Sequence, residues 1–172
     1  KFKDDYSRGI SQFSEKFMYP QGDELFNCGA GDNGCVDAFG KYQMCMLLRH
    51  PDMVYDLKSG SLREGLTKVF PRFRYTKATN YAYLERCARC FIKGLCEQCP
   101  GKSWSEHGTL DTPVEYLCQV AHAQARFLGL LKEGEYAWEV GNWQERIERL
   151  VEKEKNRSTK SKAVHVSLEG EE

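Results

Sequence analysis

The sequence lacks the features that mark membrane proteins and nucleic-acid-binding proteins. No run approaches the roughly 20 consecutive apolar residues that a membrane-spanning helix needs. Lysine plus arginine equals aspartate plus glutamate at 25 each, so no basic field is available to attract a phosphate backbone or an anionic membrane. No internal repeat is visible either. We therefore expect neither a nucleic acid nor a membrane as a partner.

The first residues lack both an initiator methionine and the apolar core of a secretory signal peptide. At 172 residues the chain has the length of one domain, since domains commonly contain about 100–200 residues. We expect one main domain that continues a longer protein, with that protein in the cytoplasm.

Short strands and a short helix are indicated in the first half of the chain. Residues 35–38 and 42–45 flank Gly40, a residue type that tight turns favour, and this pattern predicts a β-hairpin. A capping-box pattern at 61–64 predicts the start of a helix, and Pro71 is expected to end it.

Apolar residues at helical spacing predict further helices. One follows Pro113, which suits a first helical position, and carries Cys118 on its apolar face. Another is expected within 133–152, and residues 1–20 also carry an apolar stripe. The stripe consists of Tyr6, Ile10, Phe13 and Phe17, and the face of the later helix consists of Trp143, Ile147, Leu150 and Val151. The charged segment 153–172 has no aromatic residue, so we expect a disordered tail there.

Eight cysteines are the most informative feature of the sequence. An even number fits disulfides outside the cell or metal thiolates inside it. Four of them fall within thirteen residues, namely Cys87, Cys90, Cys96 and Cys99. Disulfides between such close neighbours would constrain little of the unfolded chain, so four thiolates at a metal centre use the spacing better. We expect this segment to be a loop wrapped around an inorganic core, within an α+β fold.

The intervals between the cysteines separate two kinds of metal centre. Paired C-x2-C knuckles can hold zinc, but they usually stand about 15–20 residues apart rather than five. In bacterial two-cluster ferredoxins, three close cysteines bind one cluster and a fourth, followed by proline, ligates the other. Cys99-Pro100 has that form. The same logic gives one set of Cys87, Cys90, Cys96 and Cys118. It gives a second set of Cys28, Cys35, Cys45 and Cys99.

These residues match a known pattern over about 26–132. The matching blocks are Cys28-x11-Gly40-x4-Cys45, then Cys87-x2-Cys90-x5-Cys96, and finally Cys118. With these intervals the chain resembles the C-terminal SPASM domain of radical S-adenosylmethionine enzymes. Cys99 follows Cys96 after two residues, where the family pattern has three. Cys35 lies outside the seven-cysteine pattern, at a place where members with a fully ligated first cluster carry an extra cysteine.

The resemblance implies two [4Fe–4S] clusters. Auxiliary cluster I would be held by Cys28, Cys35, Cys45 and Cys99, which are called the cluster I cysteines below. Auxiliary cluster II would be held by Cys87, Cys90, Cys96 and Cys118, called the cluster II cysteines. The implied fold is a small hairpin with cluster-binding loops and surrounding helices, attached by a connecting helix over 1–25 to an upstream partial TIM barrel.

The same resemblance implies a function for the longer protein. The C-x3-C-x2-C motif that binds the S-adenosylmethionine-cleaving cluster does not occur in the chain, so that third [4Fe–4S] cluster and S-adenosylmethionine would belong to the upstream barrel. The expected enzyme modifies a peptide or protein substrate by radical chemistry. Its auxiliary module would transfer electrons, drawn from a donor such as flavodoxin or ferredoxin, and help to position the substrate.

Other interpretations remain open. A structural zinc module with four-cysteine sites and a secreted disulfide scaffold both fit the cysteine count. The histidines are not expected to be ligands because eight cysteines suffice; they are His50, His107, His122 and His165. Four arginines near the cysteine run could offset cluster charge or could simply be solvated; they are Arg72, Arg74, Arg86 and Arg89.

Overall fold

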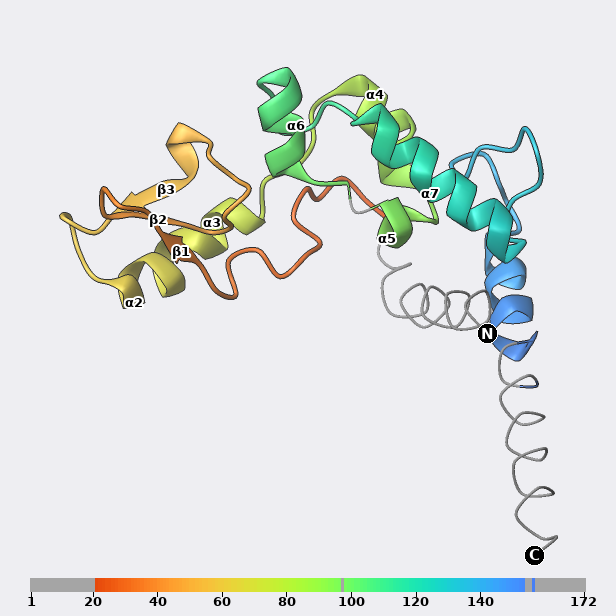
Figure 1. The fold of residues 1–172 in the computed structure, drawn as a ribbon, viewed down its shortest axis with the longest axis horizontal. Helices are drawn as coiled ribbons and strands as arrows, with labels where there is room; N and C mark the ends of the chain where they lie inside the picture. Colours follow the sequence, from red (N-terminus) through yellow and green to blue (C-terminus); the bar gives the residue numbers. More distant parts are fainter. Residues whose placement is uncertain (1–20, 97, 154–155, 157–172) are drawn as a thin grey trace, which may run out of the picture.

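The structure, a computed structural model, describes residues 21–96, 98–153 and 156. Residues 1–20 of the expected connecting helix over 1–25 and nearly all of the expected tail over 153–172 lie outside the described residues. Residues 21–25 are described and are not helical, so the predicted helix is wrong there. The described part has a small sheet at one end and the longest helix, α7, toward the other (Figure 1). Among the described residues, no helix combines the length and the hydropathy that crossing a membrane requires.

The predicted α+β class and the hairpin are both confirmed. Strands β1 (Cys35–Val36), β2 (Lys41–Gln43) and β3 (Val54–Asp56) form an antiparallel sheet in that order. Gly40 turns the chain between β1 and β2 with a φ of 78°, a left-handed conformation that glycine adopts without steric penalty. The third strand was not anticipated, because three half-buried residues show no alternating pattern.

The helix after Ser61 is longer than predicted. It runs through α2 (Leu62–Glu64), a π-helical turn (Gly65–Val69) and α3 (Phe70–Arg74). The capping prediction is confirmed, since Ser61 Oγ accepts the Glu64 backbone N–H at 3.3 Å. The stop at Pro71 is wrong. The wider π turn, in which the Phe70 N–H reaches Gly65 O, lets Pro71 occupy the first turn of α3, where a missing N–H is tolerated.

The cysteine-rich segment is helical rather than a simple loop, so that expectation is also wrong. It contains α4 (Tyr81–Glu85), the 3-10 helix η3 (Cys87–Arg89), α5 (Lys93–Cys96) and α6 (Pro100–His107). Local capping explains their presence. The Asn80 side chain accepts the Ala82 N–H at 2.9 Å to start α4, and Gly108 ends α6 with a φ of 69°. Each piece is too short for an apolar period to reveal it in sequence.

Two helices complete the described chain. Helix α7 (Glu115–Leu128) has Val114 as its N-cap, so Pro113 precedes the helix instead of opening it. A helix over 143–153 follows a series of turns and buries Leu150. Both helices present apolar residues to the interior, as their spacing predicted.

Buried side chains form two clusters. The sheet core lies between the sheet, α3 and α4 and includes Met44, Leu48, Phe70 and Tyr83. The helical core lies around α5, α7 and the 143–153 helix and includes Phe91, Ile92, Ala125 and Leu130. Cys87 packs against the sheet core, whereas Cys90 belongs to the helical core. The cysteine-rich segment therefore lies where the two cores approach each other.

Candidate metal centre

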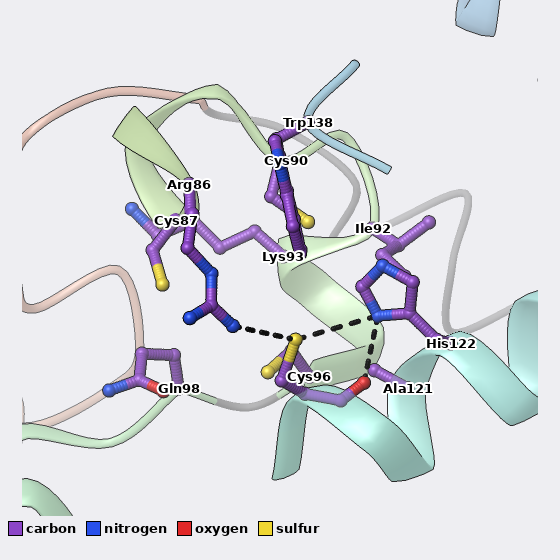
Figure 2. A pocket seen from close by; sticks show the side chains of 11 residues that line it. Arg86, Cys87, Cys90, Ile92, Lys93, Cys96, Gln98, Ala121, His122 and Trp138 are labelled. Atoms are coloured by element: carbon purple, nitrogen blue, oxygen red, sulfur yellow. Dashed lines mark hydrogen bonds between the residues drawn. The ribbon is translucent and has the colours of Figure 1, made fainter. Parts of the chain in front are cut away.

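The structure brings the four cluster II cysteines together around one pocket (Figure 2). The pocket has an empty volume of about 340 Å³, part of which is open to solvent. Its walls come from η3, α5 and α7, which together supply Cys87, Cys90, Cys96 and Cys118. All eight cysteines lie in the described part of the chain as free thiols. Over residues 21–96, 98–153 and 156, no group of three or more metal-ligating side chains is arranged to hold a metal ion.

Local structure explains why these thiols share a wall. Cys87 opens η3, and Cys90 closes it by donating its backbone N–H to Cys87 O at 3.3 Å. Cys96 ends α5, where its N–H donates to Ile92 O at 3.1 Å. Cys118 lies in the first turns of α7, which contacts α5. The two-residue and five-residue intervals thus correspond to one tight turn and one short helix.

Burial keeps these thiols protonated. Burial, and to a lesser degree the neighbouring Cys118, raises the pKa of Cys87 to about 11, and burial raises that of Cys90 to about 12. Burial also raises the pKa of Cys96 and of Cys118, although Arg86 works in the opposite direction at Cys118. Metal ligation requires thiolates, so a metal entering this pocket must displace protons and must itself supply the compensating positive charge.

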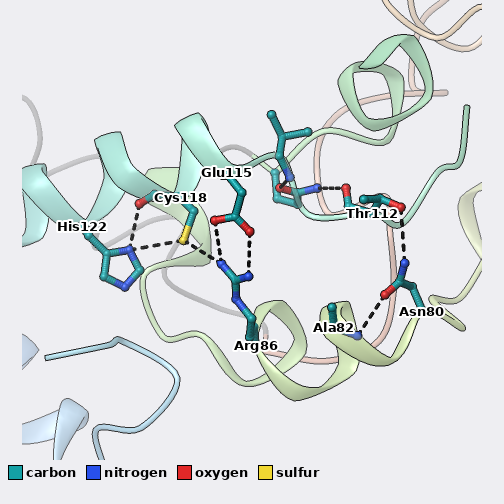
Figure 3. Close-up of polar contacts among 9 residues, drawn as sticks. Asn80, Ala82, Arg86, Thr112, Glu115, Cys118 and His122 are labelled. Atoms are coloured by element: carbon teal, nitrogen blue, oxygen red, sulfur yellow. Dashed lines mark hydrogen bonds and ion pairs between the residues drawn. The ribbon is translucent and has the colours of Figure 1, made fainter. Parts of the chain in front are cut away.

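Arg86 connects the pocket wall to α7 (Figure 3). Its Nη1 and Nη2 donate to the two Glu115 carboxylate oxygens at 2.7 and 3.1 Å, and Nη2 also donates to Cys118 Sγ at 3.7 Å. The guanidinium carbon lies 4.8 Å from the Trp138 ring centroid. Arg86 Nε is buried and has no hydrogen-bond partner among the described residues. An unpaired buried donor beside a thiol-lined pocket fits an acceptor bound in that pocket.

Lys93 supplies a second cation to the wall. Its Nζ donates to Gly22 O at 3.0 Å and Glu24 O at 3.3 Å, and lies 5.2 Å from the Tyr83 ring centroid. Burial lowers the Lys93 pKa, while the nearby cysteines Cys87 and Cys90 act to raise it. Lys93 therefore ties the start of the described chain to the cysteine segment and places its ammonium group near the thiols.

His122 lies in the same wall, one helical turn after Cys118. Its Nδ1 donates to Cys118 O at 2.8 Å and lies 3.6 Å from Cys118 Sγ, while Nε2 accepts the Ala137 N–H at 3.2 Å. Burial lowers the His122 pKa, which favours the neutral ring. Because Nε2 accepts the Ala137 N–H, the proton of the neutral ring lies on Nδ1. The spacing of four residues from Cys118 was a usable sequence signal for this position.

The cluster I cysteines lie outside the pocket that the cluster II cysteines line. Cys35 in β1 lies opposite Gln43 in β2, and its thiol donates to Gln43 Oε1 at 3.9 Å. Burial raises the pKa of Cys35, and Cys45 acts in the same direction. Cys35 lies in the edge strand β1, and Cys45 lies two residues after the end of the central strand β2.

Backbone contacts hold the other two cluster I cysteines in place. Cys28 is exposed, and its carbonyl accepts from Arg74 Nη2 at 3.2 Å. Cys99 is the N-cap of α6, whose Gly101 packs against the backbone of Leu47. No hydrogen bond among the described residues joins the thiol of Cys28 or Cys99 to the other two cysteines. The predicted cluster I set therefore stays a prediction.

Comparison of the chain with protein-family models, with curated proteins and with solved structures gives no significant match. The interpretation of the pocket therefore depends on its residues, their spacing and their surroundings.

Proposed function

We propose that the chain is an auxiliary iron–sulfur module in which the cluster II cysteines bind a [4Fe–4S] cluster. One observation carries the proposal: four cysteines that spacing alone assigns to one ligand set line a single pocket. Three of them lie in one short segment, whereas Cys118 comes from α7, so the meeting of all four is a property of the fold.

The chemistry of the pocket fits such a cluster. Soft thiolate ligands suit iron–sulfur clusters and zinc, and four of them satisfy a [4Fe–4S] core. The charged side chains that line the pocket are Arg86 and Lys93, whose positive charge would offset that of a thiolate-ligated cluster. The unpaired Arg86 Nε offers a donor to it. A bound cluster would supply one-electron transfer, while the chain's residues hold it, exclude water and supply hydrogen bonds.

A second cluster, held by the cluster I cysteines, belongs to the same proposal. Its support is the electrostatic effect of Cys45 on the Cys35 thiol and the packing of Gly101, two residues after Cys99, against the segment that follows Cys45. A metal that bound all four thiols would also hold together the segments that carry them.

In the longer protein, the module would serve a cytoplasmic radical S-adenosylmethionine enzyme of the SPASM type that modifies a peptide or protein. The upstream barrel would bind S-adenosylmethionine and the third [4Fe–4S] cluster. Electrons would come from a flavodoxin or ferredoxin. The support for this wider role is the spacing of the cysteines and of Gly40.

Metal analysis of the full chain, reconstituted without oxygen, tests the proposal. Two clusters require about eight iron and eight sulfide per chain, with the brown colour and absorbance of [4Fe–4S] centres. Stoichiometric zinc in a colourless protein would instead indicate a structural zinc module. In such a module the four sulfurs would lie within about 3.8 Å of one another, because each Zn–S bond is about 2.3 Å long.

Two matched variants divide the iron between the sites. Cys118→Ala should lower the iron content by about half through loss of cluster II, and Cys35→Ala should do the same through cluster I. Each change removes one thiol from a different predicted set. Identical spectra for the two variants would show that the division into two sets is wrong.

A further inference from the structure

Arg86 lies next to two of the predicted cluster II ligands. It is the last residue associated with α4 and immediately precedes Cys87, so its backbone is fixed beside one predicted ligand. Its side chain reaches a second predicted ligand, Cys118, at 3.7 Å. The side chain is 28% exposed and Trp138 lies over the guanidinium group.

Glu115 opposes this cation from the same helix that carries Cys118. The carboxylate accepts from both Nη atoms of Arg86, and it stands three residues before Cys118 in α7. Arg86 Nη2 therefore divides its hydrogen bonding between a carboxylate and a thiol sulfur. One positive and one negative charge are held in fixed geometry beside a single sulfur atom.

We infer that the Arg86–Glu115 pair sets the reduction potential of the centre bound by Cys118, with Arg86 raising it and Glu115 restraining that effect. The inference rests on the proposed function. Reduction adds one electron from an external one-electron donor, here dithionite, and so adds one negative charge without making or breaking a bond or requiring a proton. Arg86 stabilises that added charge by its own charge and by its hydrogen bond to sulfur, and the partly buried site screens it weakly.

The opposite signs of the two residues give the inference its test. Arg86→Gln removes the cation, so the midpoint potential of cluster II should become more negative. Glu115→Gln removes the anion and leaves Arg86 uncompensated, so the potential should become more positive. Arg89→Gln is the matched control, because Arg89 is 63% exposed and pairs with Glu85 outside the pocket.

The experiment uses the full chain, reconstituted without oxygen, and its iron and sulfide contents are measured first. The midpoint potentials are then determined by dithionite titration monitored by electron paramagnetic resonance. The inference expects shifts of opposite sign for Arg86→Gln and Glu115→Gln, and none for Arg89→Gln. The double variant should lie between the single ones. Cluster I provides an internal reference that should not move.

Each other outcome counts against the inference. Shifts of the same sign, or unchanged potentials at normal iron content, would reduce the pair to a link between α4 and α7. If Arg86→Gln cannot hold iron, the Glu115→Gln potential decides, and a value equal to that of the Arg89→Gln control overturns the inference. Absence of iron from the unmodified chain would instead refute the proposed function itself, and the inference with it.

Discussion

Gly101 gives the sharpest test of how the cluster I region is held together. It is buried in α6, two residues after Cys99. A Cβ atom placed there would lie 2.7 Å from Leu47 O and 3.1 Å from Leu48 N. Real Cβ atoms do not approach other atoms at 2.7 Å, and the obstacles are backbone atoms that cannot rotate away. Gly101→Ala must therefore push α6 away from the segment that follows Cys45.

Two effects of opposite sign meet in this variant. Alanine is favoured over glycine in a helix by about 1 kcal/mol, which alone would stabilise the variant. Overpacking a tight contact costs about 1–3 kcal/mol, and backbone obstacles favour the upper part of that range. We expect a net loss of about 1–2 kcal/mol in the free energy of unfolding, the overpacking term less the helix-propensity gain. For a chain of this length such a loss lowers the melting temperature by about 2–8 °C.

Thermal and urea unfolding of the metal-free chain measure this loss, with Gly141→Ala as the control. Gly141 has open space around the position of a Cβ and lacks a left-handed φ, so its variant should unfold like the unmodified chain. After reconstitution, Gly101→Ala should lose iron from cluster I and retain it in cluster II. A Gly101→Ala chain as stable as the control would refute the close packing of α6 on Leu47.

Two further predictions concern the polar contacts of the described chain. Arg146 donates to both carboxylate oxygens of Glu135, and together with the Lys132 backbone N–H it lowers the Glu135 pKa from about 4.5 to about 2. This pair therefore stabilises the fold fully above pH 4.5 and loses its contribution as the pH falls toward 2. Glu135→Gln should flatten the pH dependence of the free energy of unfolding in that interval. Parallel curves of unfolding free energy against pH for the two proteins would contradict the ion pair. Ser103 is fully buried and its hydroxyl donates to Thr112 O at 2.8 Å, so Ser103→Ala should cost about 1–3 kcal/mol in urea unfolding. Ser105→Ala, on the exposed side of the same helix, should change stability by less than about 0.5 kcal/mol, and equal losses would show that burial does not set the cost.

The features predictable from sequence are those set by neighbouring residues. Gly40 marks the hairpin because only a left-handed residue closes that turn, and Ser61 marks a helix start through its own hydroxyl. The spacing of the cluster II cysteines anticipated a shared pocket, since a tight turn and a short helix bring nearby thiols to one side.

The remaining features depend on contacts between distant segments. Strand β3 is defined by its antiparallel pairing with β2, where Lys41 lies opposite Asp56, and no local pattern signals that pairing. The sequence did not decide whether Arg86 offsets cluster charge or is solvated. Its solvation depends on Trp138, which lies in a segment of turns far along the chain and covers the guanidinium group. The helix beyond Pro71 needed a π turn, whose position follows from packing rather than propensity.

The position of the cluster II cysteines between the two cores couples metal binding to folding of the chain. Cys87, Cys90 and Cys96 can meet after local folding, because closing a short loop costs little entropy. Cys118 joins them only when α7 has docked on α5. A metal that holds all four thiols thus also holds α7, and by mass action its concentration shifts the docking equilibrium. On the proposed function, the folded fraction of the helical core would report how much iron was available when the chain was made.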